Sequence, residues 1–174
     1  MSLVAVTNHL QNTLTPVFSG LVSPLNLGRI ATRVPNKLNF QMVQLLINHA
    51  FSEQIEEGDF EFLTGRVLQI EIRDANLFVG LTYAQNKVIC NHFASVAIES
   101  DVKLSVDTLN AIRMIQQEVD PDTLFFRRKL KISGDTELAH HVKNTIDTLN
   151  PDLIPPMFMK LLTEYRTRFL KSAE

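Results

Sequence analysis

Residues 68–104 consist of short segments in which apolar and polar side chains alternate, and this pattern limits the possible folds more than any other feature of the sequence. Leu68, Ile70 and Ile72 alternate with polar residues, and the same period of two recurs over residues 77–83, 88–92 and 96–104. This period is typical of strands that bury one face. The breaks between the segments are too short for a helical crossover, so the pattern predicts an antiparallel meander.

Helical patterns on both sides of these strands indicate an α+β protein with a mainly antiparallel sheet of five strands flanked by helices. The densely apolar helix that follows Pro35 needs a cover on most of its circumference, from the protein core or from a bound apolar ligand. The expected elements are a helix from Pro35 to a point before Gly58, a helix capped by Ser105 that ends near Asp120-Pro121, a strand over residues 129–133, a helix capped by Asp135 that ends at Asn150-Pro151, and a last helix from Pro155-Pro156.

The first 28 residues contain no Asp, Glu, Lys or Arg. They lack the basic start of a secretory signal and the roughly 20 consecutive apolar residues of a membrane span. We expect an N-terminal extension over residues 1–33, uncharged as far as Gly28, and one domain over residues 34–174. Packing of the extension on its own domain is favoured over contact with a membrane or a partner, because a weakly amphipathic segment without flanking cations has little interfacial affinity.

Charge, cysteine and histidine content exclude several classes of function. A net charge of -2 gives no field that would gather nucleic acid, so no nucleic-acid partner is expected. A single cysteine, Cys90, cannot form an intramolecular disulfide and fits a reducing cytoplasm. Cys90 and His92 share one strand face but lack two further zinc ligands, and the chain has no phosphate-binding loop or nucleophile motif. We therefore expect no metal, no cofactor and no catalytic residue.

An aromatic segment, Leu124-Phe125-Phe126, continues directly into the basic segment 127–131. The rings could contact the tail of an amphiphile and the cations its anionic headgroup. The alternative places the rings in the core and the cations in water. This alternative is favoured, because the alternation of Lys129 and Lys131 is typical of the solvated face of a strand.

Residues 120–147, which contain the Gly134-Asp135 turn between a strand and a helix, strongly resemble the sterol-carrier-type lipid-binding family. A second block, Gly58 to Asp74, resembles the branch of this family that serves bacterial ubiquinone biosynthesis, and the two blocks cover about a quarter of the chain. The resemblance implies a five-stranded sheet flanked by helices around an apolar tunnel. It also implies a non-enzymatic role in carrying or presenting prenylated ubiquinone precursors in the oxygen-independent branch of the pathway. The implied protein partners are UbiU- and UbiV-like hydroxylation proteins, which carry iron–sulfur clusters.

Apolar residues from three segments are expected to line this tunnel, although each of them singly would also suit an ordinary core. They are Phe125, Phe126, Leu138, Val142, Phe158, Leu161, Leu162, Tyr165 and Phe169. The C-terminal helix follows a break over residues 150–156 that contains three prolines, so we hypothesise that it is a movable lid.

Other functions stay open at this point. The same pattern suits a scaffold that holds biosynthetic enzymes without carrying lipid, or a carrier of phospholipid or fatty acid. A hydrolase or transferase acting on lipid is a weaker alternative, since no polar residue such as His92 or His140 stands in a catalytic pattern. A cytoplasmic location with transient contact to a membrane is expected.

Overall fold

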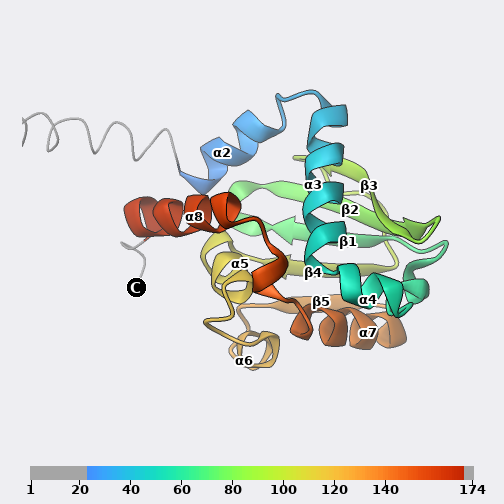
Figure 1. The fold of residues 1–174 in the computed structure, drawn as a ribbon. Coiled ribbons are helices and arrows are strands. Elements are labelled where there is room, and N and C mark those ends of the chain that lie inside the picture. Colours follow the sequence, from blue (N-terminus) through green and yellow to red (C-terminus); the bar gives the residue numbers. More distant parts are fainter. Residues whose placement is uncertain (1–22, 171–174) are drawn as a thin grey trace, which may run out of the picture.

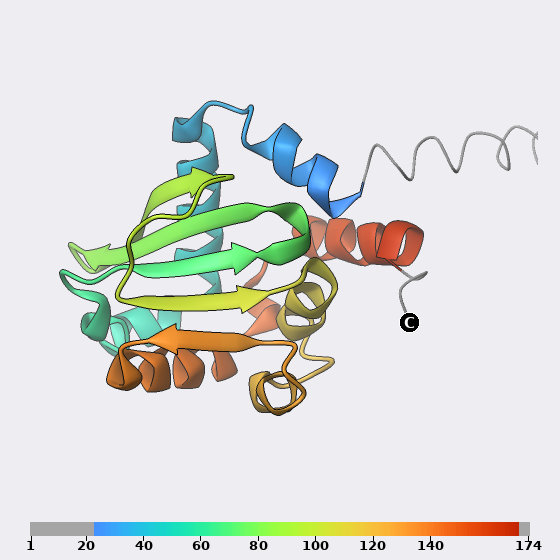
Figure 2. The ribbon, with the colours of Figure 1, turned by 180° about the vertical axis from the view of Figure 1, so that it is seen from behind.

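Five strands form one sheet in the order β3-β2-β1-β4-β5, and α3, α4 and α7 lie against one of its faces (Figure 1). The opposite view shows the strands without these helices in front of them (Figure 2). The computed structural model describes residues 23–170. Its elements are α2 (Pro24–Ala31), α3 (Asn36–Ala50), α4 (Ser52–Glu56), η1 (Glu61–Leu63), β1 (Leu68–Ile72), η2 (Arg73–Ala75), β2 (Leu77–Ala84), β3 (Lys87–Ala94), β4 (Val102–Val106), α5 (Thr108–Ile115), α6 (Pro121–Phe126), β5 (Lys131–Gly134), α7 (Thr136–Asp147), η3 (Pro151–Leu153), α8 (Pro156–Tyr165) and η4 (Arg166–Leu170).

The predicted fold class is confirmed, but the sheet is mixed rather than an antiparallel meander throughout. Strands β1, β2 and β3 form the expected meander, whereas β4 pairs in parallel with β1. The seven residues between β3 and β4 reach about 23 Å when extended, which exceeds the roughly 14 Å across three strand spacings. This connection lies against the uncovered face, where the Ile98 amide donates to Gln69 Oε1 at 2.7 Å. Residues 95–101 therefore cross the sheet as an extended loop, without the helix that commonly connects two parallel strands.

Several element boundaries also differ from the sequence prediction. Ser105 lies inside β4, and Asp107 caps α5 instead by accepting from the Asn110 amide at 2.9 Å. The chain leaves the helix near Gln117, whose φ is 53°, and Pro121 begins a separate helix, α6, that was not expected. The predicted cap of α7 is confirmed, because Asp135 Oδ1 accepts from the backbone amides of residues 137 and 138 at 3.0 Å each.

The core lies between the covered face of the sheet and the helices, with Leu104, Leu124 and Val142 at most 2% exposed. Helix α3 covers the edge strand β3 and bonds to its backbone: Asn48 exchanges hydrogen bonds of 2.8 and 2.9 Å with Val88, and Gln44 accepts from the Cys90 amide at 3.2 Å. These bonds satisfy polar groups that a bare edge strand would leave open to pairing with another chain. The outward side of α3 has no such cover among the described residues.

Cys90 is predicted to be unreactive while the protein is folded. Its side chain is 2% exposed, and burial raises the pKa of the thiol from about 9 to about 11, although a backbone hydrogen bond at His92 acts in the opposite direction. The folded protein thus holds the thiol proton more tightly than the unfolded chain does. The contribution of the Cys90 thiol to the free energy of unfolding is constant below about pH 9. As the pH rises from about 9 to about 11, the free energy of unfolding falls by about 2 kcal/mol.

Two measurements check this prediction. A thiol reagent applied near neutral pH is expected to label Cys90 only after urea is added. Urea unfolding across the alkaline range is expected to show an extra loss of stability that disappears in Cys90→Ala. Rapid labelling of the native protein would contradict the prediction.

Candidate functional site

The structure distributes eight of the nine expected lining residues over three places. Leu138 and Val142 face the core from α7 and are buried, whereas Phe125 and Phe126 on α6 are 42% and 80% exposed. The residues on α8 form a third group. Phe158 is half-buried against a small cluster that consists of Ala50, Leu149 and Ile154. Leu162 and Tyr165 are half-buried as well, whereas Leu161 is exposed. The side chain of Phe169 lies outside the described residues. Whether these residues contact lipid stays a prediction.

Polar contacts attach α8 and η4 to the end of α5. Gln116 donates to Thr163 Oγ1 at 2.8 Å and accepts from Arg166 at 2.7 Å, and Arg166 also pairs with Glu118 at 2.5 Å. Tyr165 is partly buried there, and this burial, together with the negative charge of Asp74, raises the pKa of its hydroxyl to about 12. The hypothesis that α8 is a movable lid stays a prediction.

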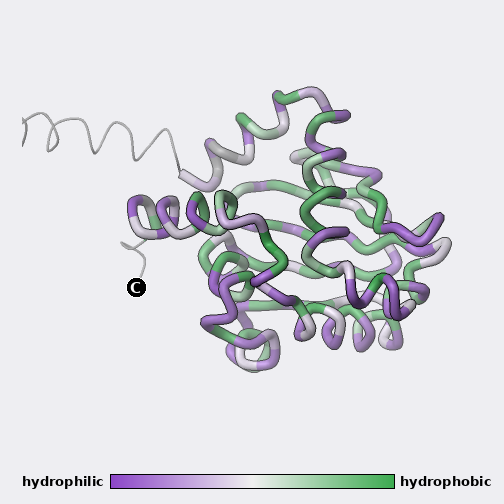
Figure 3. Tube along the Cα trace, viewed as in Figure 1, coloured by the Kyte–Doolittle hydropathy of each residue, from purple (hydrophilic) through white to green (hydrophobic). Residues whose placement is uncertain are grey.

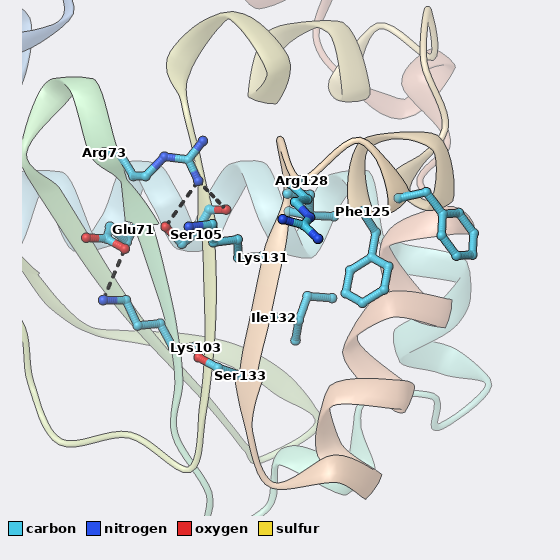
Figure 4. A pocket seen from close by; sticks show the side chains of 11 residues that line it. Glu71, Arg73, Lys103, Ser105, Phe125, Arg128, Lys131, Ile132 and Ser133 are labelled. Carbon is cyan, nitrogen blue, oxygen red and sulfur yellow. Dashed lines mark hydrogen bonds and ion pairs between the residues drawn. The ribbon is translucent and has the colours of Figure 1, made fainter.

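A pocket of about 720 Å³ follows the edge strand β5 and joins the uncovered face of the sheet to α6 (Figure 4). Strand register brings its polar wall together: Glu71, Ser105 and Lys131 align across β1, β4 and β5, and Lys103 aligns with Ser133. The other end is aromatic and aliphatic. The residues that line the pocket are Glu71, Arg73, Lys103, Ser105, Phe125, Phe126, Arg128, Leu130, Lys131, Ile132 and Ser133.

The pocket has an excess of positive charge. Lys103 is neutralised by Glu71 at 3.0 Å. Burial by itself would raise the pKa of the Glu71 carboxyl, but hydrogen bonds from Ser105 and Lys103 outweigh this effect and lower it, so Glu71 is ionised near neutral pH. Arg128 and Lys131 form no ion pair among the described residues. The arrangement therefore favours a ligand that has a negative or strongly polar group.

Arg73 holds the polar wall in place. Its guanidinium donates to the Ser105 carbonyl at 3.1 Å and to the Lys129 carbonyl at 3.0 Å, and it pairs with Asp107 at 3.3 Å. These contacts connect the end of β4, the cap of α5 and the turn that enters β5. Figure 4 shows the bonds from Arg73 to Ser105. Because the planar guanidinium satisfies several acceptors at once, Arg73 is a positioning residue for this wall.

The apolar end of the pocket is formed by α6. The rings of Phe125 and Phe126 meet edge to face with their centroids 5.9 Å apart. Arg128 follows in the left-handed region, with a φ of 59°, where it closes the turn between α6 and β5. Two neighbouring rings exposed beside cations that form no ion pair within residues 23–170 are suited to an amphiphile, with the rings against its apolar part and the cations near its head.

The sequence indicates one part of this pocket and gives no indication of the rest. The aromatic and basic segments were identified as a candidate amphiphile site, and the interpretation that places these rings in the core is wrong, because both are exposed on α6. Glu71, Lys103 and Ser133 were not identified. The period of two in the sequence places all three residues on the face of the sheet opposite the core. Which of them become neighbours depends on the order of the strands, which the period does not give.

Among residues 23–170, no group of three His, Cys, Asp or Glu side chains is placed to hold a metal ion. A second pocket, of about 440 Å³, lies where the His141 ring stacks on Phe62 with the centroids 5.2 Å apart. His141 is thus an exposed residue beside this pocket. The helices of the described part are too short or too polar to span a membrane.

Comparison with known proteins identifies the family. The sequence model of the SCP-2 sterol transfer family matches residues 44–147. The ubiquinone biosynthesis accessory factor UbiT of Escherichia coli strain K12 is 32% identical over 130 residues, which are 75% of this chain and 72% of that protein. Among solved structures, the UbiJ-SCP2 ubiquinone synthesis protein covers 65% of this chain and 97% of its own, with a TM-score of 0.47 and 19% identity. The solution structure of the sterol carrier protein domain 2 of Helicoverpa armigera has a TM-score of 0.42 and 17% identity, and covers 62% of this chain and 86% of its own. On the family match and the identity to UbiT, the chain belongs to the SCP-2 sterol transfer family.

Proposed function

We propose that this protein is a lipid-binding accessory factor of ubiquinone biosynthesis, which carries prenylated precursors and presents them to the enzymes that modify them. Membership of a sterol transfer family and the identity to UbiT support this role. The observation that carries it in the structure is the pair of exposed rings, Phe125 and Phe126, at the apolar end of a pocket whose other end is charged.

Transfer energetics explain why such a carrier is useful. An isoprene unit has five carbons, and exposure of each methylene-sized group to water costs about 0.8 kcal/mol. A protein pocket replaces one apolar environment by another. The free-energy changes for uptake of the lipid from a membrane and for its release to an enzyme are therefore both close to zero. A long polyprenyl tail exceeds a pocket of about 720 Å³. The expected lining residues on α7 and α8 therefore stay part of the proposal, with α8 as the hypothesised lid.

The proposed chemistry lies outside this chain. The ionised Glu71 is held by Lys103 and Ser105, so it is not a proton donor near neutral pH. UbiU- and UbiV-like proteins are the proposed hydroxylation partners, in the oxygen-independent branch of the pathway and in the cytoplasm. The protein itself would bind and present the substrate without acting as an enzyme.

A second candidate is a carrier of phospholipid or fatty acid. The observation that favours it is that Arg128 and Lys131, two cations of the pocket, form no ion pair in the part of the chain that the structure describes, which suits an anionic headgroup. A scaffold that binds enzymes and no lipid is a third candidate, and it predicts an empty pocket.

Lipid extraction separates these candidates. The protein is purified without detergent from a bacterium that makes ubiquinone, and the bound lipid is identified by mass spectrometry. Prenylated quinone precursors in near-stoichiometric amount are expected. Phospholipid or fatty acid alone would support the second candidate, and an empty protein that also takes up no prenylated phenol would favour the scaffold.

A further inference from the structure

Strand β5 is the outermost strand on one side of the sheet, and its outer edge pairs with no other strand among residues 23–170 (Figure 2). The opposite edge of the sheet differs, because α3 bonds to the backbone of β3. An uncovered edge presents backbone N–H and C=O groups that can pair with an extended segment of another chain. The β5 edge is therefore the place where this sheet can accept a further strand.

The pairing with β4 determines which backbone groups of β5 face outward. The Asp135 amide donates to the Asp101 carbonyl at 2.9 Å, and in an antiparallel pair such bonds recur at every second residue. Lys131 and Ser133 therefore direct their backbone groups toward β4. The N–H and C=O of Ile132, which lies between them, point away from β4.

Helix α6 occupies only the first of these outward positions. The Leu130 amide donates to the Leu124 carbonyl of α6 at 3.1 Å. Farther along the strand, within the described residues, no backbone bond outside the pairing of β4 with β5 involves Ile132 or Gly134. The pocket of about 720 Å³ lies against Ile132 and Ser133, so open space follows this edge. An extended chain can therefore reach these backbone groups.

Cations are concentrated at the start of this edge. Arg127, Arg128, Lys129 and Lys131 are exposed, and none of the ion pairs in the described part of the chain involves them. Figure 3 shows the hydrophilic turn that leads from α6 into β5. The first acidic residue after these cations is Asp135, which follows the other end of β5 and caps α7. The edge therefore has a local positive charge, in a protein whose formal net charge is -2.

The two faces of β5 differ in polarity, so they specify the side chains that an added strand needs. Figure 4 shows Lys131 and Ile132 on opposite sides of β5, with Ile132 toward Phe125. Ile132 packs against the core, and Phe125 is 42% exposed. Opposed side chains of neighbouring strands lie on the same face, about 5 Å apart. A strand beside β5 would therefore place apolar residues next to Ile132 and acidic residues next to Lys131.

We propose that the outer edge of β5 binds an extended segment of a partner protein, in which acidic and apolar residues alternate, as an added strand of the sheet. In this mode of recognition the paired backbones supply affinity and the alternate side chains supply specificity. The added strand lies along the pocket that contains Phe125 and Phe126, so it brings the partner next to bound lipid. This purpose rests on the proposed carrier function, whereas the pairing itself does not.

Charge argues against other occupants of this edge. A second copy of the chain would bring Lys129 and Lys131 of both copies together, and lysines on an edge strand are a common device against such self-pairing. The first 22 residues of the chain contain no Asp or Glu, so they do not complement the cations. A free anionic headgroup would complement the cations but leave the backbone of Ile132 unpaired. An acidic strand complements both.

Binding of a synthetic heptapeptide of alternating glutamate and valine, with both ends blocked, tests the charge requirement. Fluorescence anisotropy with the full-length protein is expected to show saturable binding. A peptide with lysine in place of glutamate is expected to bind about tenfold or more weakly. Lys129→Glu/Lys131→Glu is expected to weaken binding of the glutamate peptide by about tenfold or more.

A matched control makes the same change of charge at two exposed cations on α8 and η4. This control, Lys160→Glu/Arg168→Glu, is expected to bind the peptide within about twofold of the wild type. Equal loss in the two variants would overturn the proposal, because binding would then depend only on net charge. Circular dichroism confirms that each variant is folded before its binding is compared.

Methylation of the peptide backbone tests the pairing without any change in the protein. In an antiparallel arrangement the valine amides face β5, and in a parallel arrangement the glutamate amides do. Of two peptides, one methylated at every valine amide and one at every glutamate amide, one is expected to bind about tenfold or more weakly than the other. Equal binding of the two would overturn the added strand, because attraction between charges does not depend on which amides are free.

Hydrogen exchange measured by NMR locates the added strand. The Ile132 amide is expected to exchange rapidly in the free protein and about tenfold or more slowly with the glutamate peptide, whereas the Ser133 amide is protected in both states. An Ile132 amide that is already protected in the free protein would overturn the proposal, because the edge would then be covered by a second copy or by this chain.

Cargo and pairing are measured separately, so the two proposals can fail separately. The lipid bound to the same purified protein is identified by mass spectrometry in parallel. A protein that pairs with the peptide but holds no prenylated lipid would support the β5 edge and contradict the carrier function. A protein that holds prenylated lipid but does not bind the peptide would contradict the added strand alone.

Discussion

Gly134→Ala is expected to destabilise the protein by about 3–5 kcal/mol, a large part of the roughly 5–15 kcal/mol by which an ordinary domain is stable. Gly134 has a φ of 112°, and a methyl group there would lie 2.3 Å from the Asp101 carbonyl oxygen and 2.9 Å from the Val102 Cα. Both neighbours are backbone atoms of the segment that enters β4, so relief requires the strands to separate. The same Asp101 carbonyl accepts from the Asp135 amide at 2.9 Å, and Asp135 caps α7.

A matched control separates crowding from backbone strain. Gly65 also has a positive φ, 71°, but no atom lies within 4 Å of the position that its Cβ would occupy. Gly65→Ala is therefore expected to cost only about 1 kcal/mol, from the left-handed backbone conformation. Urea unfolding of the two variants measures the difference. Equal losses at the two positions would contradict the assignment of Gly134 as the point of contact between β4, β5 and α7.

Phe125→Ser/Phe126→Ser is expected to lower the lipid bound per protein by about tenfold or more while leaving the fold intact. Each ring is expected to lose on the order of 100 Å² of contact with an apolar ligand, which corresponds to about 2 kcal/mol. The rings contribute little to the core because they are 42% and 80% exposed, so the free energy of unfolding is expected to change by less than about 1 kcal/mol. Mass spectrometry of the extracted lipid and urea unfolding measure the two effects.

A second variant, on the C-terminal helix, tests the other exposed group of expected lining residues. Met157 and Leu161 on α8 are 77% and 56% exposed, so Met157→Ser/Leu161→Ser removes two exposed apolar side chains from a different place. This variant is expected to keep most of its lipid if the α6 end of the pocket makes the main contact. The reverse result, with loss of lipid only in the α8 variant, would move the site to the C-terminal stripe. Loss in neither variant would exclude both groups as the main contact.

Local sequence patterns were sufficient for most of the elements. The period of two located β1, β2 and β3, and Asp135 after Gly134 predicted the start of α7. Such patterns are reliable because they depend on neighbouring residues: which side chains alternate, which residue caps a helix, and where a proline stops one. The same patterns predict a meander that includes β4, because the number of residues in a loop does not specify which strand the next segment pairs with.

The sequence by itself determined the α+β class, the resemblance to a lipid-binding family and the absence of a recognisable catalytic motif, because each of these depends on local periods and motifs. Tertiary structure alone decided the composition of the candidate sites. Strand order brings Glu71 and Arg73 beside Lys131, which is about 60 residues away in the chain, and helix packing selects which side of α3 stays exposed. The physical reason is that a pocket or an exposed helix face depends on contacts between distant segments, and no single segment encodes those contacts.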